Sequence, residues 1–162
     1  MKIVAISEHD WEDLKKVRLA SLLESPAAFG IQLKDAIDYT AEDWMQRASQ
    51  KQGPRFFIAY IDEVPIGLIG GVFANNEYEL ISMWVAPGSR GYGVGKLLVD
   101  TLKENALKEG YRSLILKVSP DNKAAFNLYA RCGFRVVGNG GALASDKNIL
   151  LQKMEWSENI RP

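Results

Sequence analysis

The stretch Val85–Leu98, VAPGSRGYGVGKLL, places four glycines within eleven residues, directly before the apolar spacing of a helix. Fixing a glycine backbone costs more conformational entropy than fixing any other residue, so this cluster needs a physical reason. The N-terminus of a helix exposes unpaired N–H groups and partial positive charge, and it therefore attracts anions such as phosphate. A glycine-rich surface turn without a ligand is the alternative, and a short glycine motif alone does not decide between the two.

Length and composition restrict the class of protein. The 162 residues suit one domain with a sizeable core, and we expect a single domain over 1–162. The formal net charge of +0 gives no attraction to nucleic acid or to an anionic membrane, so we expect neither as a partner. The single cysteine, Cys132, excludes an intrachain disulfide and is compatible with the reducing cytoplasm, which is the expected location. The N-terminus becomes charged too early for a signal peptide, and the most apolar stretch, 64–74, is too short to span a bilayer.

Hydrophobic periodicity and helix caps predict an ordered series of strands and helices. Strands are expected at 2–6, 55–61, 65–74, 77–85, 113–118, 134–138 and 148–156. Helices are expected at 11–22 after a cap at Ser7 or Asp10, at 41–48 after Thr40, at 94–110 and within 119–133. The last two strands are expected to be joined by a loose loop, 139–147.

This order predicts an α/β (α+β) fold with a mixed, mostly antiparallel sheet of about six to seven strands and helices on both faces. Short connections within 55–85 favour antiparallel hairpins, whereas the strand–helix–strand unit 77–118 favours a parallel crossover. The glycine stretch then lies at the C-terminal end of the fourth strand, where sheets with parallel crossovers commonly bind ligands.

Two common phosphate-binding motifs do not fit the glycine stretch. A Walker P-loop needs a glycine where Arg90 stands, and a Ser or Thr where Leu97 stands. A dinucleotide-binding fingerprint that starts at Gly91 needs a glycine where Lys96 stands.

A third pattern fits. The run Arg90–Gly95, RGYGVG, matches the Q/R-x-x-G-x-G/A signature, and the chain here resembles the GNAT superfamily of N-acetyltransferases. A later segment is similar to the family pattern N-x-x-A-x-x-x-Y-x-x-x-G-F through Asn122, Ala125, Tyr129, Gly133 and Phe134. The early stretch SPAAFG, 25–30, and the order of elements along nearly the whole chain also resemble the family. The resemblance implies a GNAT-like sheet with splayed central strands.

The resemblance implies acetyl-CoA as the cofactor. Its pyrophosphate is expected on backbone N–H groups of the glycine stretch, through Arg90, Gly91, Tyr92, Gly93, Val94, Gly95 and Lys96. Arg90 and Lys96 would add positive charge, although Lys96 is equally interpretable as a solvated helix residue. The pantetheine arm is expected between the splayed strands, on the backbone of Met83, Trp84 and Val85, with Val85 nearest the thioester. Asn122 either contacts the cofactor or only caps its helix.

The resemblance also implies that a primary amine attacks the thioester directly in a ternary complex. An alkyl amine has a pKa of about 10.4, so a proton must be removed before attack, and the leaving thiolate must then be protonated. Tyr129 matches the family tyrosine that serves as general acid, with core packing as the alternative. Glu79 lies where several members carry a glutamate base that acts through a water, and an exposed edge carboxylate is the alternative. On a regular strand Glu79 shares one face with Ile81, Met83 and Val85.

The acceptor is expected to be an amine of a small molecule or of a protein. The family architecture implies that its pocket is shaped by the loop 139–147 and by Phe29, Tyr39, Trp44 and Tyr78. We expect no metal site. Many members dimerise, so a homodimer stays open. The competing function is a non-catalytic acyl-CoA-binding sensor or interaction module of the same fold, but such a module needs neither Tyr129 nor Glu79.

Overall fold

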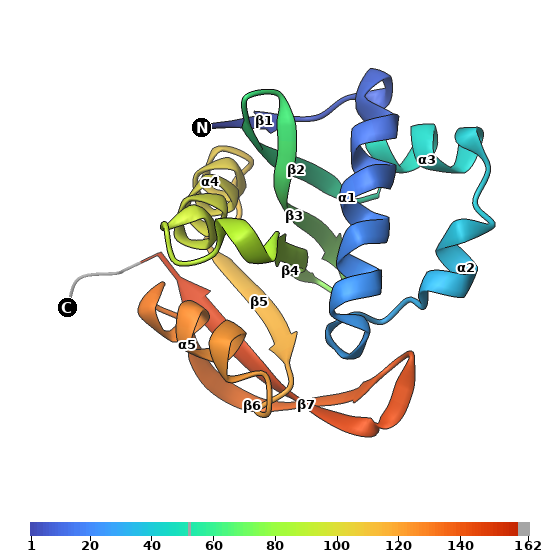
Figure 1. The fold of residues 1–162 in the computed structure, drawn as a ribbon. Helices are drawn as coiled ribbons and strands as arrows, with labels where there is room; N and C mark the ends of the chain where they lie inside the picture. Colours follow the sequence, from blue (N-terminus) through green and yellow to red (C-terminus); the bar gives the residue numbers. More distant parts are fainter. Residues whose placement is uncertain (52, 159–162) are drawn as a thin grey trace.

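The computed structural model describes residues 1–51 and 53–158, in which a seven-stranded sheet has the order β1-β2-β3-β4-β5-β7-β6 (Figure 1). Strands β4 and β5 pair in parallel, and the other neighbouring strands pair antiparallel. This confirms the predicted mixed, mostly antiparallel sheet. The strands are β1 (Lys2–Ala5), β2 (Arg55–Ile61), β3 (Val64–Ala74), β4 (Glu77–Val85), β5 (Ser113–Val118), β6 (Arg135–Leu143) and β7 (Asp146–Ser157).

The helices begin where capping side chains were expected. Thr40 accepts a hydrogen bond from the Asp43 N–H and starts α3, and Ser7 forms the same kind of capping box before α1. The five-residue helix α2 was not predicted, because it is too short to show a helical period. The helices are α1 (Trp11–Glu24), α2 (Leu33–Ile37), α3 (Ala41–Ala48), α4 (Val94–Lys108) and α5 (Lys123–Arg131).

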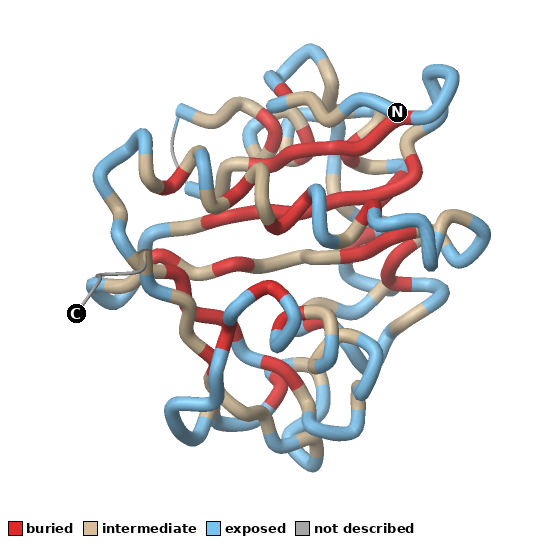
Figure 2. Tube along the Cα trace, turned by 90° about the vertical axis from the view of Figure 1, so that its left-hand side faces the viewer, coloured by how far each residue is buried: buried red, intermediate tan, exposed pale blue. Residues whose placement is uncertain are grey.

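The sheet separates two hydrophobic cores. Helices α1, α2 and α3 pack on one face, around Leu14, Trp44 and Phe56, whereas α4 and α5 cover the other face, around Leu102 and Tyr129. Figure 1 shows the two groups of helices on opposite sides of the strands, and Figure 2 shows the buried residues running along the central strands. The predicted placement of helices on both faces is therefore confirmed.

The central strands β4 and β5 diverge. Their ladder contains the single pair Glu79↔Ile115, whereas β3 pairs with β4 from Ala74↔Glu77 to Gly67↔Val85. Beyond Glu79, the β4 edge that faces β5 therefore lacks strand partners over the described residues. This is the splayed arrangement expected from the sequence, and it leaves backbone groups of β4 free to bind an extended ligand.

A β-bulge at Ser82 changes which side of the sheet each β4 residue faces. Leu68 pairs with Trp84 and Gly70 pairs with Ile81, so β4 carries one more residue than β3 here. Ser82 adopts a φ of 58°, a left-handed value that is rare for a residue other than glycine.

The bulge corrects one prediction about Glu79. Ile81 packs with the α1–α3 core, whereas Met83 and Val85 pack with the α4–α5 core. Because side chains alternate along a regular strand, Glu79 shares a face with Ile81 and not with Met83 or Val85. The prediction that it also shares a face with Met83 and Val85 was wrong, since it assumed an unbroken period of two.

The segment 139–147 is not the loose loop that its glycines suggested. Strand β6 continues to Leu143, and β7 already begins at Asp146, so the two strands form a long hairpin with a tight connection. Register shifts at several points absorb the irregular sequence. Backbone pairing with β7 stabilises this glycine-rich part of β6. A prediction from side-chain periodicity cannot detect such pairing, so the segment was predicted as a loop.

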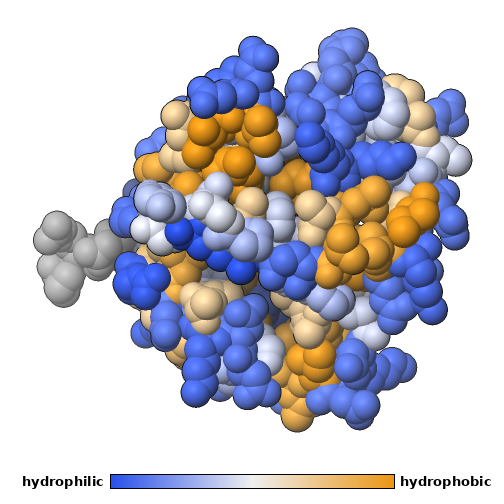
Figure 3. Space-filling model, viewed as in Figure 1, coloured by the Kyte–Doolittle hydropathy of each residue, from blue (hydrophilic) through white to orange (hydrophobic). Residues whose placement is uncertain are grey.

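On the face drawn in Figure 3, apolar areas lie apart from one another among hydrophilic side chains. Across the described helices, length and apolar character fall short of what crossing a membrane requires.

Candidate active site

A large pocket of about 810 Å³ opens at the C-terminal end of β4. Its walls come from both sides of the sheet: the α1–α2 connection, the end of β4, the glycine stretch and one face of α5. Residues of both cores line it, so the pocket reaches both faces of the sheet at the end of β4. Its lining is Ser25, Ala28, Phe29, Met83, Trp84, Val85, Ser89, Arg90, Gly91, Gly93, Val94, Gly95, Lys96, Asn122, Ala124, Ala125, Leu128, Tyr129, Arg131 and Cys132.

The glycine stretch shapes the start of α4. Gly91 and Gly93 have φ values of 86° and 83°, which side chains with a Cβ rarely adopt. Gly93 is the N-cap of α4, and no side chain caps this helix end. The first N–H groups of α4 therefore face the large pocket without a side-chain partner, which makes this helix end suitable for an anion.

Gly95 has a packing role that the sequence did not show. A Cβ added there would lie 2.9 Å from Leu128 Cδ2 and 3.2 Å from Met83 Cε. The absent side chain therefore makes room for contact between α4, α5 and β4. Gly95 also lines the large pocket, and its expected place beside the cofactor stays a prediction.

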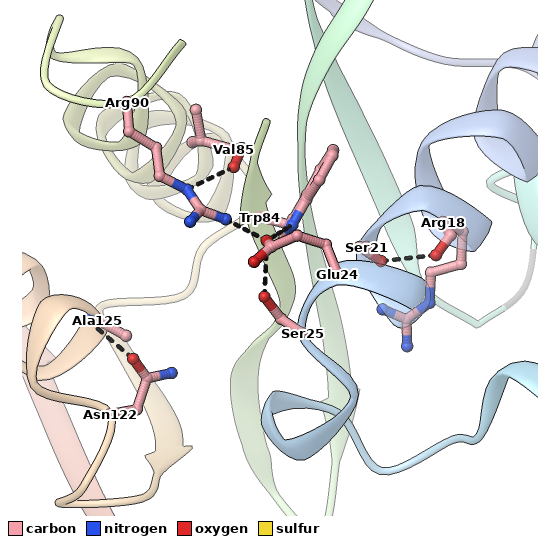
Figure 4. A network of polar contacts seen from close by, with 9 residues as sticks. All are labelled: Arg18, Ser21, Glu24, Ser25, Trp84, Val85, Arg90, Asn122 and Ala125. Atoms are coloured by element: carbon pink, nitrogen blue, oxygen red, sulfur yellow. Dashed lines mark hydrogen bonds and ion pairs between the residues drawn. The ribbon is translucent and has the colours of Figure 1, made fainter. Parts of the chain in front are cut away.

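Both cations of the glycine stretch are paired. Arg90 donates through Nε to the Val85 carbonyl oxygen at 2.8 Å, and its Nη2 forms an ion pair with Glu24 at the end of α1 (Figure 4). Lys96 pairs with Asp100 at 2.7 Å, and this hydrogen bond raises the pKa of Lys96. Arg90 therefore bridges β4 and α1, in contrast to the expected free charge for a phosphate.

Glu24 is the centre of a polar network that crosses the mouth of the large pocket. One carboxylate oxygen accepts from Ser25 Oγ at 2.7 Å, from Trp84 Nε1 at 2.9 Å and from Arg90 (Figure 4). The hydrogen bonds from Ser25 and then Trp84 lower the pKa of Glu24, so it is ionised at neutral pH. The network fixes the end of α1 against the end of β4.

The predicted strand residues divide between the two faces. Met83 and Val85 face the α4–α5 core, whereas Trp84 packs in the α1–α3 core and reaches Glu24. Tyr92, also expected to touch the cofactor, is 80% exposed and lies outside the lining of the large pocket. Val94 is buried beneath the helix start.

Tyr129 is buried in α5 and lines the large pocket together with Met83 and Val85. Burial raises the pKa of its hydroxyl far above the ordinary tyrosine value, so the group keeps its proton at neutral pH. Tyr129 therefore contributes a protonated hydroxyl to the residues that line the pocket. Asn122 accepts a hydrogen bond from the Ala125 N–H and caps α5, and it also lines the pocket, so its two interpretations hold together.

Glu79 lies outside the large pocket. It is partly exposed at the point where β4 and β5 still pair, and none of the described residues forms an ion pair with it. Its side of the sheet, shared with Ile81, is the one that carries α1 and α3.

A small pocket of about 370 Å³ lies on that same side of the sheet. It is formed by α1, the α2–α3 region, β2 and the β4 bulge. Its lining is Leu14, Arg18, Ile31, Ala36, Tyr39, Trp44, Arg47, Pro54, Phe56 and Ser82. The linings of the small and large pockets touch at Phe29, which lines the large pocket and whose ring contacts Arg18 of the small one.

The predicted acceptor residues separate into two groups. Phe29 lines the large pocket, and Tyr39 and Trp44 line the small one. Tyr78 lines neither and lies in the α4–α5 core, where burial raises its pKa to about 12. Its ring occupies the space beside Gly71, within 2.6 Å of where a Cβ would stand. The prediction that Tyr78 shapes the acceptor pocket is corrected on this ground.

Sequence reasoning missed several residues of the two pockets. Glu24 and Arg18 lie on exposed-looking turns of α1, and nothing in their local pattern distinguishes them from solvated charges. Leu128 was indicated only indirectly, since it occupies the helix position directly before Tyr129.

The fold is therefore an α/β fold in which β4 and β5 diverge and α4 begins after a glycine-rich stretch with no side-chain cap. The sequence profile described as the Acetyltransferase (GNAT) family matches residues 16–134. The chain therefore belongs to the GNAT family of acetyltransferases, as the resemblance had indicated.

Two relatives cover the greater part of this chain. Mycothiol acetyltransferase of Streptomyces avermitilis is 31% identical over 120 residues, which are 73% of this chain and 37% of that protein. N-acetylaspartate synthetase of Rattus norvegicus is 29% identical over 120 residues, 73% of this chain and 38% of that protein. The chain thus matches less than half the length of either relative.

Solved structures share the fold over nearly the whole chain. A GNAT-family acetyltransferase from Streptococcus pneumoniae superposes with a TM-score of 0.79 at 21% identity, covering 96% of this chain and 98% of that one. The PaiA N-acetyltransferase from Thermoplasma acidophilum, solved in complex with coenzyme A, gives a TM-score of 0.73 at 24% identity, with the same coverage.

Proposed function

We propose that this protein transfers an acetyl group from acetyl-CoA to a primary amine, by direct attack within a ternary complex. The observation that carries the proposal is that one pocket joins the uncapped start of α4, the free edge of β4 and the buried Tyr129. These are an anion site, an extended backbone site and a proton donor. The residues present therefore fit the cofactor that the family implies.

The cofactor is expected to lie along β4. The first N–H groups of α4, after Gly93, would hold the pyrophosphate, and the unpaired edge of β4 would hold the amides of the pantetheine arm. Val85 is the β4 residue nearest the glycine stretch in sequence, and Met83 and Ser82 lie farther along the strand. We therefore place the thioester end of the arm toward Met83 and Ser82, and not at Val85 as the sequence had suggested.

When bound, acetyl-CoA supplies an acetyl group that is activated as a thioester. Tyr129 Oη is protonated at neutral pH and carries the proton that the departing sulfur would need, although burial makes this hydroxyl a weaker acid than a solvated tyrosine. Glu79 lies on the side of the sheet that carries the small pocket, where an amine can approach the bulge. Glu79 would accept the proton of the amine through a water, because its carboxylate lies outside the pockets.

Replacing Tyr129 by Phe tests the proposal against the sensor alternative. Y129F keeps the ring that packs against Phe134 and removes only the hydroxyl. An enzyme should lose turnover by about 100-fold or more, the usual contribution of a general acid, while acetyl-CoA binding measured by calorimetry stays near the wild-type value. An unchanged rate would remove Tyr129 from the mechanism. Binding without any transfer in the wild type would favour the sensor module.

Three expectations about the protein as a whole remain predictions. A single domain over 1–162, a cytoplasmic location and a homodimer each await measurement. Size-exclusion chromatography with light scattering decides the last of these directly.

A further inference from the structure

The small pocket collects hydrogen-bond donors that lack acceptors. Trp44 is 1% exposed, and its Nε1 is buried without a partner among the described residues. Nη1 of Arg18 is buried and equally unpartnered there. A buried donor without an acceptor is destabilising, so native proteins seldom keep one without a reason.

The small pocket is also positively charged. Arg18 and Arg47 both line it, and the ion pairs found within 1–51 and 53–158 involve neither of them. Burial lowers the pKa of Arg18 to about 10, so the guanidinium stays charged at neutral pH. Asp43 lies near enough to Arg47 to feel its charge, but its carboxylate caps Thr40 and does not line the pocket.

Aromatic rings hold both guanidinium groups in place. Arg18 Cζ lies 4.7 Å from the centre of the Phe29 ring, and Arg47 Cζ lies 4.1 Å from the centre of the Tyr39 ring. Figure 4 shows the Arg18 side chain leaving α1 apart from the Glu24 network, with no hydrogen bond drawn to its guanidinium. A guanidinium held by stacking keeps its N–H groups available for a planar acceptor such as carboxylate.

The position of the small pocket connects it to the chemistry. Phe29 contacts Arg18 of the small pocket while lining the large pocket, so the two linings touch there. A molecule with an anionic group near Arg18 and Arg47 can therefore extend past Phe29 toward the large pocket. The volume of about 370 Å³ is at the lower end for ligand pockets, so the group it holds is small.

We propose that the acceptor is a small primary amine that carries a carboxylate, of the size of an amino acid, with the carboxylate bound by Arg18, Arg47 and Trp44 in the small pocket. This inference rests on the proposed function, because it names the substrate class of that site. It also disfavours polyamines and other polycationic amines, since the pocket lining contains two arginines and no carboxylate.

Matched acceptor pairs test the inference. The wild type is assayed for coenzyme A release with leucine, methionine and phenylalanine, and with their carboxamides, which keep the amine and remove the negative charge. We expect kcat/KM to be at least about tenfold higher for each acid, as a hydrogen bond to a charged group predicts. Spermidine, an aminoglycoside and 2-aminoethylphosphonate complete the panel. The inference is overturned if the protein binds acetyl-CoA but transfers the acetyl group only to amides or polycations, or to no panel member. Transfer to the phosphonate in preference to every acid also overturns it. Each of these results leaves the use of acetyl-CoA as cofactor unaffected.

Variants separate recognition from folding. R18Q and W44F should reduce the acid-to-amide ratio of kcat/KM by about 10- to 100-fold, and R18K should restore part of it. R135Q, which removes an exposed arginine of β6 outside both pockets, should keep the wild-type ratio. An unchanged ratio in folded R18Q overturns the inference.

A direct binding measurement works even without turnover. N-acetyl-leucine, the expected product, is titrated by calorimetry into the wild type, R18Q and R135Q in the absence of acetyl-CoA. Binding that weakens by about 10-fold or more only in R18Q supports the carboxylate site, even if acetyl-CoA itself fails to bind and the proposed function falls. Equal binding by all three proteins, or none by the wild type, counts against the carboxylate site independently of the cofactor.

Discussion

The contact of Gly95 with its neighbours allows a quantitative test of how the large pocket is built. An added methyl group at Gly95 would stand 2.9 Å from Leu128 Cδ2 and 3.2 Å from Met83 Cε. Both contacts are closer than ordinary van der Waals packing, but both neighbouring atoms are ends of flexible side chains. The G95A variant is therefore expected to fold, with Met83 and Leu128 displaced.

Two opposing energies determine the stability of G95A. Alanine favours a helix over glycine by at most about 1 kcal/mol. Overpacking a close contact costs about 1–3 kcal/mol. The net result is a destabilisation of about 0–2 kcal/mol, or a melting temperature lower by up to about 8 °C for a chain of this size. The displaced side chains also narrow the large pocket, so we expect acetyl-CoA to bind about fivefold or more weakly, a loss of about 1 kcal/mol.

Urea denaturation and calorimetric titration of acetyl-CoA measure both effects. G88A is the matched control, because a Cβ at Gly88 meets no atom within 4 Å and the residue has no left-handed φ. It should leave both quantities near the wild-type values. If G95A were more stable than the wild type by the full helix-propensity gain and bound acetyl-CoA equally well, the packing argument would be refuted.

Three further predictions follow from named contacts. G71A should destabilise the fold by about 1–3 kcal/mol in urea titration, because its Cβ would overlap Tyr78, 2.6 Å away. E79Q should lower kcat by about 100-fold with acetyl-CoA affinity retained, whereas loss of both would indicate a structural role. Since the pKa of Glu24 is lowered in the folded state, its stabilising effect is present above the unfolded value of about 4.3 and is lost as pH falls through the folded value. E24Q should accordingly be less stable than the wild type at pH 7. The difference in stability should be small, because the Glu24 side chain is 34% exposed, and it should disappear in acid.

The candidate site shows which signals local sequence contains. The glycine stretch determined the start of α4, because the left-handed φ values at Gly91 and Gly93 are a local backbone requirement. Thr40 and Asn122 determined where α3 and α5 begin, since a cap acts within three residues of itself. Alternating and helical hydrophobic periods determined most strands and helices for the same reason.

Tertiary structure decided the features that depend on residues far apart in the chain. The bulge at Ser82 exists because β4 carries one more residue than β3 between two of their pairs. The sequence of β4 alone therefore did not show which of its residues share a face of the sheet with Glu79. Arg90 meets Glu24 across 66 positions of sequence, so it bridges β4 and α1, a contact that its local sequence does not show.

The same reason applies to Tyr78 and Trp44, two of the four aromatic residues that were predicted to shape the acceptor pocket. They lie on opposite sides of the sheet, Tyr78 in the α4–α5 core and Trp44 at the small pocket. Arg18 becomes a candidate ligand only where α1 meets α3 and the β4 bulge. The sequence by itself determined the family, the order of most elements and the glycine-rich start of α4, because those depend on neighbours along the chain. Packing alone decided which side chains line the two pockets, because that depends on neighbours in space.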